Sequence, residues 1–112
     1  MNSEQVLEEE FPVAAYIIAS YDIDDPEGYR GYVPGVAPLL AKHDAEVLVA
    51  DYDAKGLEGE KRGVYVVLRF ESDEAALAWY NDPAYQPVKK IRVDSSENGS
   101  LVLAQEFAIP EA

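Results

Sequence analysis

The sequence predicts one α+β domain, in which a four-stranded antiparallel sheet carries its helices on one face. The length of 112 residues suits a single domain with one core. The hydrophobic fraction of 48% is that of a globular chain. The segments follow the order strand, helix, strand, strand, helix, strand, which is the split βαβ arrangement.

The first segments are an acidic lead-in and a strand. Residues 1–12 hold four glutamates and no basic residue, so we expect a flexible tail before a single domain over 13–109. Residues 13–23 are rich in β-forming side chains whose two alternating sets are both largely apolar. This segment is the first predicted strand.

The next segment is helical. Asp25 can cap free amides, and Pro26 suits the first helical position. Pro34 and Pro38 lack amide donors, so we expect them to kink or split the helix before His43.

Two strands and a long loop follow. Residues 46–52 and 64–70 are dominated by β-forming residues, and the polar segment 53–63 between them contains three glycines. The sequence therefore predicts a hairpin.

The last third contains a helix in two parts and a final strand. Ser72 is a predicted cap for a helix over 73–80, and Asp82-Pro83 repeats the start signal before a segment from 84 to about 93. We expect a turn over 95–99 and the last strand over 101–107.

The sheet face away from the helices predicts a homodimer. In this ferredoxin-like βαββαβ arrangement one sheet face has no cover, and Tyr16, Ile18, Tyr65 and Val67 make it apolar. The same face of a second copy would cover it. Burial of this apolar surface would stabilise the dimer by about 25 cal/mol per Å². The alternative is a monomer with a partly wet sheet face.

The composition argues against several classes of binding partner and cofactor. The formal charge is −13, which opposes binding to nucleic acid or to anionic membranes and fits a soluble protein or a saline habitat. Cysteine is absent and His43 is the only histidine, so we expect no disulfide, no metal site and no cofactor. The acidic N-terminus does not have the pattern of a signal peptide, and we expect a cytoplasmic protein.

Residues 72–87, and the run AWYNDPAYQP within them above all, resemble the family called domain of unknown function 1330. Further matches extend the resemblance to about residues 13–107, including Pro26, Tyr29, His43 and Phe70. The resemblance implies the dimeric α/β-barrel superfamily, in which two ferredoxin-like sheets face each other around a cleft. That superfamily includes cofactor-free monooxygenases, isomerases, haem enzymes and ligand-sensing domains, so it predicts fold better than function.

The chain departs from the family at two places. Asp44-Ala45 replaces a usual glycine pair after the histidine, and the loop after Gly59 is short. The second departure bears on any site built on that loop.

His43 and Tyr32 are the candidate catalytic residues. Histidine titrates near neutrality and suits a general base, whereas a place in the last turn of a helix suits a structural role beside free carbonyls. Tyr32 could orient a ligand or pack in the core.

Six more residues are candidate ligand-binding groups: Glu58, Arg62, Arg69, Trp79, Tyr80 and Tyr85. The Glu58 and Arg62 side chains could bind a polar ligand, or they could form a surface ion pair. An inward Arg69 would need an anionic partner. The three aromatic residues could line a pocket or pack the core.

The predicted function is binding of a small molecule in the cleft between sheet and helices. A cofactor-independent enzyme that transfers protons through acid/base residues would fit this site. The alternative is a noncatalytic ligand-sensing or protein-interaction module, and haem binding through His43 ranks last. The motifs of nucleotide-binding, serine-hydrolase and zinc sites do not occur.

Overall fold

The structure is a computed structural model that describes residues 13–107. Its elements are β1 (Ala15–Ile23), α2 (Pro26–Tyr29), α3 (Tyr32–Lys42), β2 (Glu46–Asp51), β3 (Val64–Phe70), α4 (Asp73–Tyr80), α5 (Gln86–Asp94) and β4 (Ser96–Gln105). The expected acidic tail and the last two residues of the expected domain lie outside the described residues.

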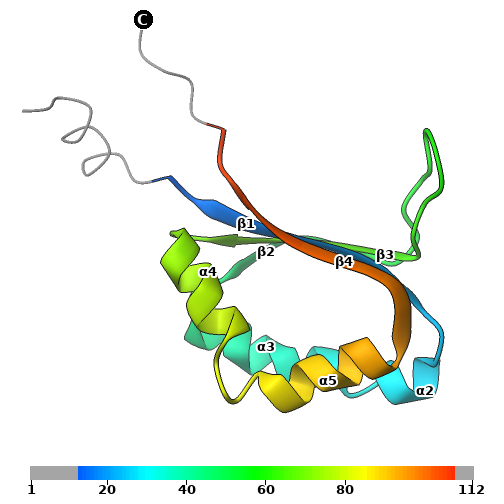
Figure 1. Cartoon of the computed structure of the whole chain (residues 1–112), viewed down its shortest axis with the longest axis horizontal. Helices are drawn as coiled ribbons and strands as arrows, with labels where there is room; N and C mark the ends of the chain where they lie inside the picture. The colour runs from blue at the N-terminus through cyan, green and yellow to red at the C-terminus, as the bar shows by residue number, and fades with distance from the viewer. Residues whose placement is uncertain (1–12, 108–112) are drawn as a thin grey trace, which may run out of the picture.

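The four strands form one antiparallel sheet in the order β2-β3-β1-β4. Figure 1 shows the helices on one side of this sheet, with the other side uncovered. The predicted α+β, ferredoxin-like βαββαβ fold is confirmed.

Local capping explains where two helices begin. The Gly28 amide donates to Oδ1 of Asp25 over 3.1 Å, and the Ala75 amide donates to Oγ of Ser72 over 3.1 Å. The first helical stretch does divide, but the break lies at Arg30 and Gly31, ahead of both prolines, and Pro38 lies inside α3.

The turn predicted over 95–99 is wrong. β4 begins at Ser96, which pairs with Ile23, while Glu97 pairs with Asp22. A register shift in β1 between Ser20 and Asp22 and a left-handed Asn98, with φ of 56°, let the strand pass through turn-forming residues. Pairing with the long β1 therefore outweighs the local turn preference.

The core lies between the sheet and the helices. Ile17 and Leu68 from the sheet pack with Val36 from α3 and Trp79 from α4. Strand β2 differs, because every one of its residues is exposed, although the strand lies at the edge of the same sheet. The helix layer thus leaves the inner face of β2 open.

The uncovered face of the sheet is apolar along its middle. The register brings Val49, Val67, Ile18 and Val102 into one row that crosses all four strands. Ile18, Val49 and Val102 are 41%, 41% and 49% exposed. The apolar open face expected from the alternation of the strands is present.

Candidate functional site

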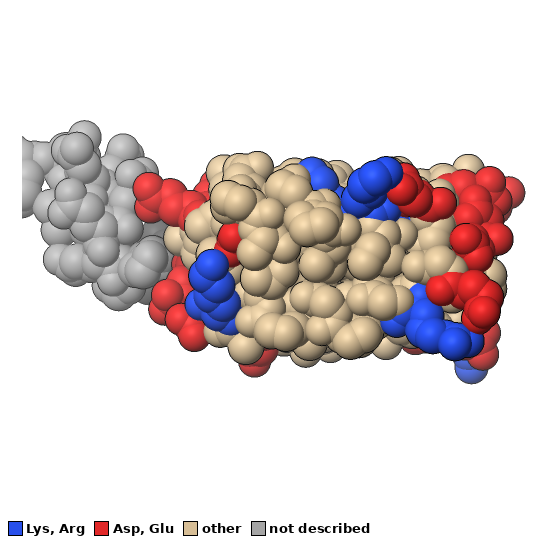
Figure 2. Space-filling view, turned by 90° about the horizontal axis from the view of Figure 1, so that it is seen from below, with Lys and Arg blue, Asp and Glu red and all other residues tan. Residues whose placement is uncertain are grey.

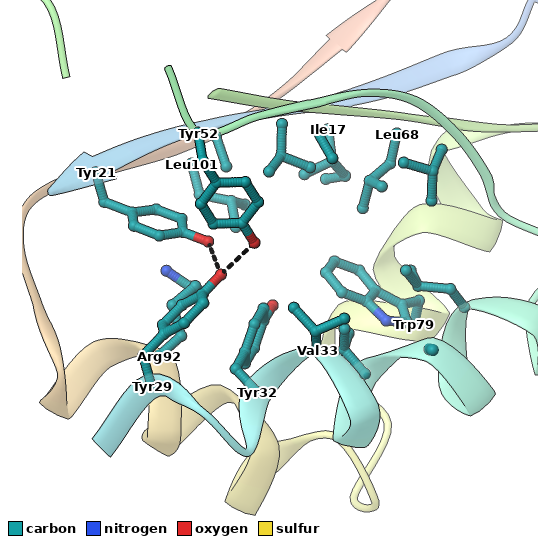
Figure 3. A pocket seen from close by; sticks show the side chains of 17 residues that line it. Ile17, Tyr21, Tyr29, Tyr32, Val33, Tyr52, Leu68, Trp79, Arg92 and Leu101 are labelled. Atoms are coloured by element: carbon teal, nitrogen blue, oxygen red, sulfur yellow. Dashed lines mark hydrogen bonds between the residues drawn. The ribbon is translucent and has the colours of Figure 1, made fainter. Parts of the chain in front are cut away.

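A pocket of about 180 Å³ lies between the sheet and the helix layer (Figure 3). Its walls come from all four strands, from the segment after β2, and from helices α2, α3, α4 and α5. The lining residues are Ile17, Ala19, Tyr21, Tyr29, Tyr32, Val33, Val36, Ala37, Leu40, Val47, Ala50, Tyr52, Val66, Leu68, Trp79, Arg92 and Leu101.

The mouth of the pocket lies where no helix covers β2. Val47 of β2 and Tyr52 just after it line the pocket, and both are about half exposed. On the opposite side Val33 of α3 lines it and is also about half exposed. The pocket is therefore open to solvent between the edge strand and α3.

Three tyrosine hydroxyls form a chain at one end of the pocket (Figure 3). The Tyr29 hydroxyl lies 2.6 Å from that of Tyr21 and 3.0 Å from that of Tyr52. Tyr21 is buried in β1, whereas Tyr52 stands at the mouth. This chain of hydrogen-bonded hydroxyls thus leads from the core to solvent.

Burial sets the protonation of these groups. It raises the pKa of Tyr29 far above its usual value, and the hydrogen bonds to Tyr21 and Tyr52 add to the effect. Burial likewise raises the pKa of Tyr21 and of Tyr32. These side chains are neutral hydroxyls at ordinary pH and suit the donation of hydrogen bonds.

Arg92 of α5 brings a positive charge to the same end of the pocket. Its guanidinium carbon lies 5.8 Å from the ring centre of Tyr21 and 5.9 Å from that of Tyr32. The side chain is only 8% exposed. Burial acts to lower the pKa of Arg92, but the hydroxyls of Tyr85 and Tyr32 raise it, and the net shift is upward.

Within residues 13–107 the Arg92 guanidinium has no carboxylate partner. Its Nε atom is buried and has no hydrogen-bond partner. The indole nitrogen of Trp79, which also lines the pocket, is buried without a partner as well. Such groups are rare in folded proteins and call for an explanation.

The structure brings Tyr32 and Trp79 together in the pocket and places Tyr85 directly behind them. The Tyr32 and Tyr85 hydroxyls are 2.7 Å apart, and the rings of Trp79 and Tyr85 lie 4.4 Å centre to centre. Tyr80 packs against the outside of this cluster, with Nζ of Lys89 lying 4.5 Å from its ring centre.

His43 lies at the C-terminal cap of α3 and does not line the pocket. Its Nε2 is 2.8 Å from Oδ2 of Asp82, and Nζ of Lys42 donates to the same oxygen over 2.8 Å. Oδ1 of Asp82 accepts the Ala84 amide over 2.9 Å. His43 therefore ties the end of α3 to the connection between α4 and α5.

The charged candidates lie apart from the pocket. Arg62 donates to Asp22 over 2.8 Å and to Glu60 over 2.7 Å, while Glu58 is exposed and does not pair with it. Arg69 belongs to the open sheet face, 3.7 Å from Glu46. These side chains do not form one site with Tyr32 and Trp79.

Four pocket residues with polar side-chain groups were not among the sequence candidates: Arg92, Tyr21, Tyr29 and Tyr52. A signal for Arg92 did exist, because Tyr85, Val88, Arg92 and Ser95 share one helix face by their spacing. A charge on an otherwise core-facing stripe marks a position that needs an explanation. The tyrosines gave no comparable signal, because their meeting depends on tertiary packing.

The fold and the pocket define a ferredoxin-like α+β protein with a cavity between sheet and helices. Over residues 14–107 the chain matches the family described as "Domain of unknown function (DUF1330)". The chain belongs to this family, as the AWYNDPAYQP run indicated. No curated protein matches the chain.

Solved structures support the fold. A protein of unknown function from Rhodopseudomonas palustris is 14% identical with a TM-score of 0.70, and the match covers 97% of this chain and 96% of that one. A dimeric ferredoxin-like protein of unknown function from Bacteroides fragilis is 13% identical with a TM-score of 0.59, covering 83% and 96%. A third from Thermobifida fusca, also described as dimeric and ferredoxin-like, is 17% identical with a TM-score of 0.60, covering 87% and 92%.

Within residues 13–107 no helix is both long and apolar enough to cross a bilayer. The same residues contain no group of three or more His, Cys, Asp or Glu side chains arranged to hold a metal ion.

Proposed function

We propose that this protein binds a small, largely apolar molecule in the pocket between its sheet and its helices, as a homodimer that pairs the open sheet faces. The observation that carries the proposal is the pocket itself. It is open to solvent beside β2, and most of its walls are aliphatic or aromatic. Binding sites for small molecules have this character: mostly apolar, with a few placed polar groups.

The size of the pocket limits the ligand. A cavity of about 150 Å³ in another protein holds benzene, so about 180 Å³ suits one aromatic ring or a chain of roughly six carbon atoms. The tyrosine hydroxyls at one end would orient a polar head group.

The chemistry of the lining favours binding without catalysis. Proton transfer at neutral pH needs a group that titrates there, and no described residue of the lining is His, Asp or Glu. Tyr32 holds its proton because of burial, and His43 is engaged by Asp82 outside the pocket. A ligand-sensing or carrier role fits this lining better than acid/base catalysis.

The homodimer is supported by the row of Val49, Val67, Ile18 and Val102. An exposed apolar row across a whole sheet is an unusual surface for a monomer. Two of the solved structures above are described as dimeric. We propose that the same row of a second copy covers this one.

The ligand proposal can be tested with 1-hexanol as a neutral probe. Trp79 is the only tryptophan and lines the pocket, so its fluorescence reports on occupancy. We expect saturable binding that Ala37→Phe weakens about tenfold or more, because Ala37 lines the pocket. Ala41→Phe is the control, since Ala41 is exposed on the same helix and outside the lining. Absence of a saturable response would contradict the proposal.

The dimer proposal is tested by light scattering. Ile18→Glu would bury a charge in the interface, which costs about 3 kcal/mol or more per unpaired charge, and should give a monomer. Leu77→Glu is the matched control, because Leu77 is similarly exposed at 46% but lies on the helix side. A monomeric wild-type protein, or an Ile18→Glu variant that remains dimeric, would rule out this interface.

A further inference from the structure

We propose that the pocket selects a monocarboxylate, a short apolar acid whose carboxylate group is held by Arg92. This inference rests on the proposed function, because it requires that the pocket bind a ligand. It names the class of that ligand.

The buried charge of Arg92 has no counter-charge among the described residues. Arg92 lines the pocket, is only 8% exposed, and pairs with no described carboxylate. A buried charge costs several kcal/mol unless it is paired and hydrogen-bonded. A ligand anion would supply that partner.

The aromatic neighbours do not replace an anion. The guanidinium lies near 6 Å from the ring centres of Tyr21 and Tyr32, at the outer limit of a cation–π contact. A ring face supplies no hydrogen-bond acceptor for an N–H group, and Nε of Arg92 is buried without one. An Arg fork matches the two oxygens of a carboxylate.

The tyrosine hydroxyls of the pocket have one more proton to donate than they use among themselves. The hydroxyls of Tyr21, Tyr29 and Tyr52 carry three protons but form two bonds with one another. A carboxylate is an acceptor only, so it complements this set.

The net charge of the protein and the size of the pocket limit which anions could bind. The formal charge of −13 opposes the approach of phosphates and other multiply charged groups. The apolar walls around about 180 Å³ require a hydrocarbon body behind the head group. A single carboxylate on a chain or ring of about six carbons satisfies both conditions.

The experiment compares hexanoate with hexanamide, its neutral analogue, by Trp79 fluorescence at pH 7. We expect the wild-type protein to bind hexanoate at least about tenfold more tightly than hexanamide, which corresponds to about 1.4 kcal/mol. Arg92→Gln should abolish the preference. Lys90→Gln is the matched control with the same charge change, because Lys90 lies on the same helix with a 74% exposed side chain.

The outcomes separate this inference from the proposed function. Saturable binding of 1-hexanol with equal affinity for hexanoate and hexanamide, or an Arg92→Gln variant that keeps the preference, overturns the carboxylate inference alone. No binding of any of the three probes overturns both proposals. If Arg92→Gln fails to fold, the wild-type comparison still decides, and Arg92→Lys should retain part of the preference because it keeps the charge but loses the planar fork.

Discussion

Tyr29 is the central residue of the hydroxyl chain. Loss of its hydroxyl should lower the free energy of unfolding more than loss of the hydroxyl of Tyr52 at the pocket mouth. Tyr29→Phe leaves the buried Tyr21 hydroxyl without its partner, which should lower the free energy of unfolding by about 1–3 kcal/mol. Tyr52→Phe should cost less than about 1 kcal/mol, because Tyr52 is 48% exposed and leaves Tyr29 its bond to Tyr21. Urea denaturation measures both changes, and equal losses would contradict a chain anchored at its buried end.

Individual residues also show what the sequence could not reveal. Alternation within β1 and β3 predicted both sheet faces correctly, because strand periodicity is local. The sequence marks Arg92 as a charge on a core-facing helix stripe, but it does not reveal that this stripe lies over tyrosines from β1 and α3. The closeness of Glu58 and Arg62 along the chain suggests an ion pair or a shared ligand site, but Arg62 instead binds Asp22 of β1, which is distant in the sequence.

At the scale of elements, Asp82 joins the end of α3 to the connection between α4 and α5. Hydrogen bonds from Lys42 first, then from His43 and the Ala84 amide, hold the pKa of Asp82 well below its usual value. A carboxyl whose pKa is lower in the folded state stabilises the fold above its unfolded pKa of about 4. That contribution is lost as the pH falls through the folded value.

The expected result is therefore a pH-dependent deficit in the Asp82→Asn variant. It should be less stable than the wild type at pH 7, and the difference should shrink as the pH falls below about 4. Thermal unfolding from pH 2 to 8 measures this. Asp94→Asn is the control, because Asp94 forms an exposed pair with Lys90 and should change stability little. A deficit independent of pH would place the role of Asp82 elsewhere.

Element boundaries were predictable where local signals and tertiary pairing agree. Asp25 and Ser72 begin helices as expected, because capping is a local interaction. The segment 95–99 has turn-forming residues, but β1 is long enough to pair with it, and the strand continues through a left-handed Asn98. The pocket arises in the same way: β2 lies at the sheet edge beyond the reach of the helices, which no local pattern reports.

At the scale of the whole molecule, charge and the open sheet face act against each other. The side of the molecule formed by the helices has a largely uncharged centre, with acidic and basic side chains gathered towards its ends (Figure 2). The formal charge of −13 belongs to each copy, so a homodimer brings two strongly negative bodies together. In the proposed homodimer the apolar row on the sheet must outweigh this repulsion.

Salt should therefore tighten the proposed dimer. The screening length falls from about 30 Å at 0.01 M salt to about 8 Å at 0.15 M, so the repulsion between the copies weakens while the apolar contact of Ile18 and Val102 remains. We expect the dimer dissociation constant to fall several-fold over this range in sedimentation equilibrium. The opposite trend would show that ion pairs such as one involving Arg69 dominate the interface, because salt weakens exposed ion pairs. It would contradict an association driven by the apolar row.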